Sequence, residues 1–193
     1  MSPKKTLDVL HELTGMLVVV PDTSERLGRV ADLILHPIQG RVLGLTVRTS
    51  EGKERALVAD DFFIFSEVGA VLAAEGALSD LEDLSSTLSG SVRASSELVG
   101  TRVVTEEGKL LGYVSGVHLL EKRLQVVYHV TASNWQRLFN GGFFIAGDLP
   151  HAYSRDGARL IVPADTKDHY AFPSLAAAIA PRIGEMAPTG ESQ

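Results

Sequence analysis

The side chains of this chain that could do chemistry are scattered along it. None of its histidines stands at the HxH or HExxH spacing that places two imidazoles on one metal ion. The absence of cysteine removes thiolate metal sites, cysteine nucleophiles and disulfide frameworks together. The sequence therefore predicts no metal ion and no cofactor. The histidines are His11, His36, His118, His129, His151 and His169.

Only His118 and His129 are expected on adjoining strands of one hairpin. If that hairpin turns tightly at Glu121 and Lys122, His118 faces Gln125. His129 then lies four residues further along, roughly 13 Å away at about 3.3 Å per residue, which is too far for a shared metal ion.

Catalytic motifs are also missing from the sequence. Residues 112–116 (GYVSG) come close to the nucleophile elbow GxSxG, but Ser115 directly precedes the second glycine, so a strand serine facing water is expected. No GxxxxGK[ST] or GxGxxG run exists for phosphate binding. We therefore expect no enzymatic activity. Three acidic pairs, Asp60-Asp61, Glu82-Asp83 and Glu106-Glu107, are interpreted as solvated turn charges, since adjacent strand side chains point to opposite faces.

An aromatic segment is the best candidate for binding a protein partner. Trp135, Arg137, Leu138, Phe139 and Phe143 lie close together, and Trp and Arg are enriched at binding hot spots. An exposed aromatic loop would mark a partner surface. The alternative is that these side chains complete a hydrophobic core.

Charge and hydropathy exclude several partners. The net charge is −6, with 8 Lys/Arg against 14 Asp/Glu in residues 1–90 and 7 of each in residues 97–165. No basic cluster exists, so direct binding of nucleic acid is not expected. No apolar run approaches the roughly 18 residues of a membrane helix, and no export signal is visible, so we expect a cytoplasmic protein without membrane insertion.

The elements that would position these side chains are repeated within the chain. Residues 12–19 recur as 97–104, an offset of 85, and residues 27–30 recur as 111–114, an offset of 84. Two further blocks follow in the same order, 41–47 with 123–130 and 62–64 with 143–145. Four matched blocks in one order indicate a duplication.

Each copy is expected to form antiparallel β-structure. Apolar alternation and Gly/Pro turns predict strands at 30–35, 41–48, 55–59, 62–65 and 70–73, and again at 112–120, 124–131 and 143–146. An Asp-Gly turn at 155–157 predicts a last hairpin. Leucines at helical spacing predict a short linker helix near 78–88, and Ser174 and Pro181 bound a helix over 174–180. The fold class is all-β.

The repeated blocks resemble the PRC-barrel family, which is named for the cytoplasmic part of the photosynthetic reaction-centre H subunit and includes the C-terminal half of RimM. Residues 12–47 and 97–130 are similar to its Gly-x-x-Val and Leu-Gly-x-Val pattern. Gly15, Gly28, Gly100 and Gly112 would be structural glycines at bends and turns. The long insertion around Trp135 departs from the family pattern.

The resemblance implies two tandem small antiparallel β-barrels with a non-catalytic adaptor role in protein–protein assembly. The expected domains are 8–75 and 97–168, joined by a linker with a short helix at 76–96 and followed by a short helix and tail at 169–193. The protein partner is unidentified, and self-association as a homodimer is included. A different expectation is a small-ligand or enzyme site in a cleft between the barrels. Its candidate groups are Tyr128, His129, Asp148 and His151.

Overall fold

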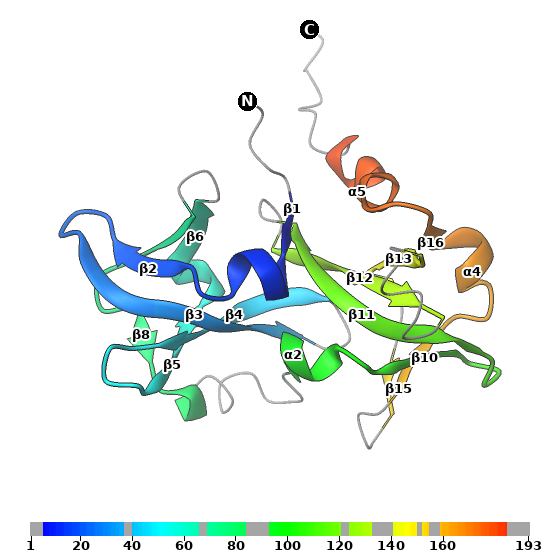
Figure 1. Cartoon of the computed structure of the whole chain (residues 1–193), viewed down its shortest axis with the longest axis horizontal. Coiled ribbons are helices and arrows are strands. Elements are labelled where there is room, and N and C mark those ends of the chain that lie inside the picture. The colour runs from blue at the N-terminus through cyan, green and yellow to red at the C-terminus, as the bar shows by residue number, and fades with distance from the viewer. Residues whose placement is uncertain are drawn as a thin grey trace, which may run out of the picture.

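The structure is a computed structural model in which strands make up most of the regular structure and the helices are short (Figure 1). It describes residues 6–36, 40–65, 69–83, 93–120, 124–132, 141–149, 152–154 and 159–184. The expectation of a mostly β fold is confirmed. The main hydrogen-bonded path runs in the order β14-β15-β10-β11-β12-β4-β3-β2-β7-β6 and does not close on itself within the described part of the chain.

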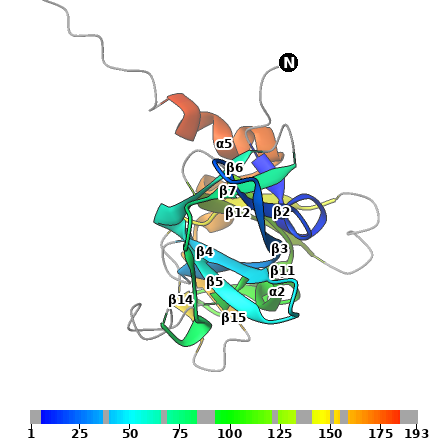
Figure 2. The ribbon, with the colours of Figure 1, turned by 90° about the vertical axis from the view of Figure 1, so that its left-hand side faces the viewer.

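The strands fall into two sets with the same pattern of pairing. In the first strand set, β3 pairs antiparallel with β2 and β4, β4 pairs with β5, and β2 runs parallel to β7, which pairs with β6. Figure 2, viewed from the side of this set, shows these strands curling around their inner face. The set comprises β2 (Leu17–Val20), β3 (Glu25–His36), β4 (Arg41–Arg48), β5 (Glu54–Val58), β6 (Phe62–Phe65) and β7 (Ala70–Ala73).

The second strand set repeats those partners. Strand β11 pairs antiparallel with β10 and β12, β12 pairs with β13, and β10 runs parallel to β15, which pairs with β14. The set comprises β10 (Arg102–Thr105), β11 (Leu110–Leu120), β12 (Gln125–Thr131), β13 (Phe143–Ala146), β14 (Ala152–Tyr153) and β15 (Arg159–Val162).

The match of residues 62–64 with 143–145 is wrong. Residues 143–146 form β13, which pairs with β12 as β5 pairs with β4, so Phe144 takes the position of Ala56. Residues 62–65 instead form β6, whose counterpart is β14, because each pairs with the strand parallel to the opening strand. Both segments contain two consecutive phenylalanines, but the place of each segment in the sheet follows from the strand with which it pairs.

Each strand set receives an additional short strand from the segment that precedes the other set. Strand β1 (Thr6–Asp8) precedes β2 but pairs with β11, with Leu7 opposite Leu119. Strand β9 (Arg93–Ala94) precedes β10 but pairs with β3, with Arg93 opposite Leu35. In Figure 1 the blue β1 lies along the green β11. We call this arrangement the reciprocal exchange.

A direct contact between the two hairpins lies within the same arrangement. Arg41 of β4 is paired with Gln125 of β12. The N–H of Val42 donates to the Leu124 carbonyl at 2.7 Å, and the N–H of Val126 donates to the Gly40 carbonyl at 3.0 Å. The two hydrogen bonds join equivalent positions of the hairpins, because β3 pairs with Arg41 and Val42 as β11 pairs with Gln125 and Val126.

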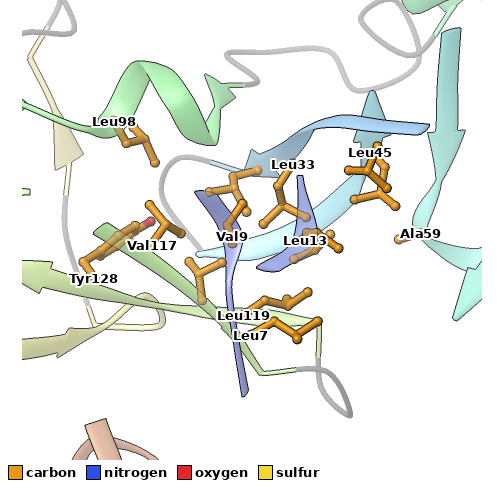
Figure 3. Close-up of a cluster of buried hydrophobic side chains, with 14 of the residues drawn as sticks. Leu7, Val9, Leu13, Leu33, Leu45, Ala59, Leu98, Val117, Leu119 and Tyr128 are labelled. Atoms are coloured by element: carbon orange, nitrogen blue, oxygen red, sulfur yellow. The ribbon is translucent and has the colours of Figure 1, made fainter. Parts of the chain in front are cut away.

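A helical turn follows each exchanged strand and anchors it in the core. Turn η1 (Val9–Leu13) follows β1, and α2 (Ser95–Leu98) follows β9. Leu13 and Leu98 are both buried in one hydrophobic cluster that includes residues of both strand sets. Figure 3 shows Leu7 beside Leu119, and Val9 and Leu13 beside Leu33. Since burying one such side chain stabilises by about 1.5–3 kcal/mol, this shared core couples the two sets.

The four glycines of the repeat occupy two kinds of position. Gly15 and Gly100 have φ values of 89° and 92°, and each follows a helical turn in open space. Gly28 and Gly112 lie where a neighbouring strand passes closely. A Cβ atom there would come within 2.4 Å of a backbone oxygen of β4 and 2.5 Å of one of β12, respectively.

The connecting elements differ in part from expectation. The expected helix over 78–88 is wrong at its start, because Leu78–Ser79 forms strand β8, which pairs with β5. Residues 81–83 are helical, and residues 84–88 lie outside the described residues. Turn η2 (Ala59–Asp61) precedes β6. After β15 come α4 (Thr166–His169), β16 (Ala171–Phe172) and α5 (Leu175–Gly184).

Helix α5 packs on the outer side of the second strand set, where Ala178 joins Leu120 and Val127. Ser174 accepts a hydrogen bond at its Oγ from the N–H of Ala177 at 3.2 Å, as an N-cap does. The expected end at Pro181 is wrong, because α5 continues to residue 184. Proline lacks the N–H that would bond to the carbonyl four residues earlier, so α5 loses one hydrogen bond at Pro181 but continues past it.

Replacing Gly28 by alanine should destabilise the protein by roughly 3 kcal/mol, because overpacking and a positive φ both cost free energy. Gly52→Ala is the matched control: φ is 77° and nothing lies within 4 Å of an added Cβ, so the expected loss is about 1–2 kcal/mol. Urea denaturation measures both. Equal losses would show that β4 does not pass Gly28 closely.

Leu7→Ala tests whether the strand sets unfold together. Truncating this buried leucine should cost about 2–5 kcal/mol. Because Leu7 lies in the shared core, fluorescence of the single tryptophan and far-UV circular dichroism should show one coincident transition that shifts as a whole. Leu110→Ala, at a leucine 49% exposed, should change little. Two separate transitions, of which one moves, would contradict the coupling.

Candidate functional site

Two of the scattered histidines come together on the outer face of the second strand set, contrary to expectation. Leu120 pairs with Gln125, so the hairpin loop is two residues longer than assumed. His129 therefore stands opposite Gly116, two residues from His118. Their ring centroids are 6.5 Å apart, whereas the assumed register placed the residues about twice as far apart.

A phenyl ring and a hydroxyl complete this cluster. The ring of Phe144 stacks on that of His129 with centroids 4.6 Å apart and planes 15° apart, and it lies 5.7 Å from the ring of His118. Ser115 Oγ lies 3.0 Å from His129 Nδ1 and donates to the His129 carbonyl oxygen at 3.2 Å. Ser115 was expected to face water. Ser115 is instead partly buried, and its hydroxyl bonds to His129.

Burial lowers the pKa of His118 below the ordinary value of 6.5. The carboxylates of Asp8 and Glu12 act in the opposite direction, and His11 lowers the pKa slightly further. All three belong to β1 and η1, the exchanged segment that lies along this part of β11. His118 is therefore a neutral imidazole at pH 7.

The cluster offers hydrogen-bonding groups and an aromatic surface. Within the described ranges, no group of three or more His, Asp or Glu side chains is placed to hold a metal ion. The acids of the pairs 60–61, 82–83 and 106–107 are all exposed, as expected for solvated charges.

The groups suggested for a cleft site do not converge. Tyr128 is 1% exposed and lies in the core, whereas His129, its neighbour on β12, points to the outer face. Asp148 is exposed in the turn after β13. His151 lies outside the described residues.

Most of the aromatic segment also lies outside the described residues, namely Trp135, Arg137, Leu138 and Phe139. Phe143 is described. It lies in β13, opposite Val130, is partly buried and packs against the main hydrophobic cluster.

A small apolar pocket lies where the two exchanged segments meet, and no sequence signal pointed to it. Its volume is about 60 Å³. Leu10 borders it and is 53% exposed. We call it the junction pocket. It is lined by Val9, Leu10, Thr14, Ala31, Asp32, Ser95, Ser96, Val99 and Val117.

Hydrogen bonds across the two segments fix the polar wall of this pocket. The carboxylate of Asp32 on β3 accepts hydrogen bonds from Ser95 Oγ and Ser96 Oγ, and from the N–H of Ser96 at 3.3 Å. It also accepts from the N–H of Leu33 at 2.7 Å. Asp32 thereby ties α2 to the first strand set.

The size of the junction pocket limits its ligands. Pockets for metabolites and drug-sized molecules usually measure about 300–1,000 Å³. A volume of about 60 Å³ admits a single small group. The pocket is therefore suited to one side chain of a partner.

No protein-family profile and no curated protein matches this sequence. Among solved structures, the chain is similar to a 16S ribosomal RNA processing protein RimM from Pseudomonas aeruginosa, at 16% sequence identity and a TM-score of 0.27. The match covers 84% of this chain and 99% of that one. Over the residues that the structure describes, no helix is long and apolar enough to cross a membrane.

The lowered pKa of His118 predicts a pH-dependent stability. Between its folded-state pKa and 6.5 the unfolded chain binds more protons, so the stabilising contribution is complete above pH 6.5 and decreases as the pH falls. His118→Gln should flatten the dependence of the unfolding free energy on pH between 5 and 8. Leu110→Ala, at an exposed and non-titrating side chain, should leave it unchanged. An unaltered slope in His118→Gln would contradict the prediction.

Proposed function

We propose that this chain is a non-catalytic protein-binding module made of two PRC-barrel-like copies. The repeated pairing order of the two strand sets supports a duplication. In this proposal the copies span 8–75 and 97–168, with a linker between them and a C-terminal helix and tail after them. The reciprocal exchange would make the copies one rigid unit with a shared surface.

The observation that carries the proposal is an apolar surface at the junction of the copies. The junction pocket is lined by residues of both exchanged segments, and Leu10 is exposed beside it. Exposed apolar surface with a polar border is typical of protein-binding sites. Because the pocket admits one side chain, it suits a protein partner better than a metabolite.

The proposed role is that of an adaptor in the cytoplasm. Its partner is a protein of unidentified kind, and self-association as a homodimer is a second form of the same role. The aromatic segment at 135–139 is proposed as a further contact region, since Trp and Arg dominate binding hot spots.

Replacing residues 135–139 by Gly and Ser tests the contact region. If the segment binds a partner, the variant should melt within a few degrees of the wild type but lose the proteins that the wild type captures in affinity purification. Leu110→Ala is the control, since it removes an exposed leucine elsewhere. Collapse of the variant would assign the segment to the core, and a wild type that captures nothing would argue against the adaptor role.

A further inference from the structure

We propose that the junction pocket binds an aliphatic side chain of a partner segment that carries Lys or Arg beside it. This inference rests on the proposed function and names the chemistry of its partner. The occupant follows from the lining, the volume and the charge of the pocket.

The lining offers a partner apolar contact and little else. Val9, Leu10, Ala31, Val99 and Val117 supply aliphatic surface. The polar groups of the wall already bond to one another, since the Asp32 carboxylate accepts from Ser95, Ser96 and Leu33. A polar side chain entering the pocket would lose its water without a ready replacement. An apolar side chain has no hydrogen bonds to water that it would lose on entering the pocket.

The volume selects among apolar side chains. A cavity of about 150 Å³ lined by aliphatic residues binds benzene. The junction pocket, at about 60 Å³, is less than half that size. A branched aliphatic group such as that of Leu, Ile or Val fits, whereas a phenyl or indole ring does not.

The charge around the pocket selects the flanks of the partner segment. The turns that line the pocket and the residues bordering them carry the acids Asp8, Glu12 and Glu97, and Asp32 lies in the wall. No lysine or arginine occurs in residues 8–14 or 94–99 themselves; Arg29 donates to the Gly15 carbonyl at 2.7 Å and Arg93 precedes α2, so four acids stand against two basic residues in and beside these segments. A cationic flank is therefore attracted to this surface and an acidic one is repelled.

The same charges argue against a second copy of this chain as the occupant. An isologous contact at the pocket would bring Asp8, Glu12 and Glu97 of one copy toward the same acids of the other. The net charge of −6 adds to that repulsion. A basic partner segment has no such penalty.

Methyl-resolved NMR of the full chain with three blocked tripeptides tests the inference. The peptides are Lys-Leu-Lys, Lys-Ser-Lys and Glu-Leu-Glu. Lys-Leu-Lys should shift the methyl signals of Leu10, Val99 and Val117 saturably. It should bind about tenfold tighter than Lys-Ser-Lys, since burial of a leucine side chain is worth at least the 1.4 kcal/mol that corresponds to tenfold. Added salt should weaken it.

Two variants locate the site. Ala31→Leu should fill the pocket and abolish the shifts caused by Lys-Leu-Lys, and Val99→Thr should weaken them with little change of shape. Leu110→Ala is the matched control and should bind as the wild type does. Melting curves verify that each variant is folded. If Ala31→Leu unfolds, the binding measured with Val99→Thr decides whether the peptide occupies the pocket.

Three results would overturn the inference. They are equal binding of the leucine and serine peptides, equal binding of Glu-Leu-Glu, and unchanged binding in the pocket variants. A peptide-free dimer that the pocket variants break would assign the pocket to self-association instead. If the pocket fails these tests while residues 135–139 still capture a partner, the adaptor role stands without it. If neither the pocket nor residues 135–139 bind a partner, the proposed function is contradicted.

Discussion

The reciprocal exchange of the N-terminal segments is the constraint on which the rest of the structure depends. Residues 118–120 of β11 pair with β1, and residues 34–35 of β3 pair with β9, so the segment before each set adds a strand to the other set. The hairpins are joined again where Arg41 pairs with Gln125. Because Leu13 and Leu98 enter one hydrophobic cluster, neither strand set completes its core without residues that precede the other. The cost of closing these long-range contacts is offset by the apolar surface they bury.

The junction pocket is a direct consequence of that exchange. Turn η1 and α2 approach each other only because each lies on the opposite strand set. Their facing positions differ, since η1 opens with Val9 and Leu10 where α2 opens with Ser95 and Ser96. Ser95 bonds to Asp32, whereas Leu10 remains exposed. A polar interaction on one side and an apolar one on the other make the surface asymmetric, as a site for a single partner segment would be.

The outer faces of the two strand sets have diverged in a different way. At Ile34 and Ala56 the first set is apolar and is covered by residues around Leu81. The equivalent positions of the second set carry His118 and Phe144. There an imidazole kept neutral by burial lies beside an aromatic ring, next to the area covered by α5. The fold therefore tolerates different chemistry on this face while its inner face keeps the same packing.

The sequence by itself determined the local elements, and the tertiary structure decided which of them meet. Alternation and turn residues were sufficient for strands such as 41–48 and 143–146, because side-chain period and turn chemistry are local properties. The partner of each strand is not local. The exchange of β1 and β9, the counterpart of Phe144, the proximity of His118 to His129 and the junction pocket all depend on loop length, register and burial over the whole molecule.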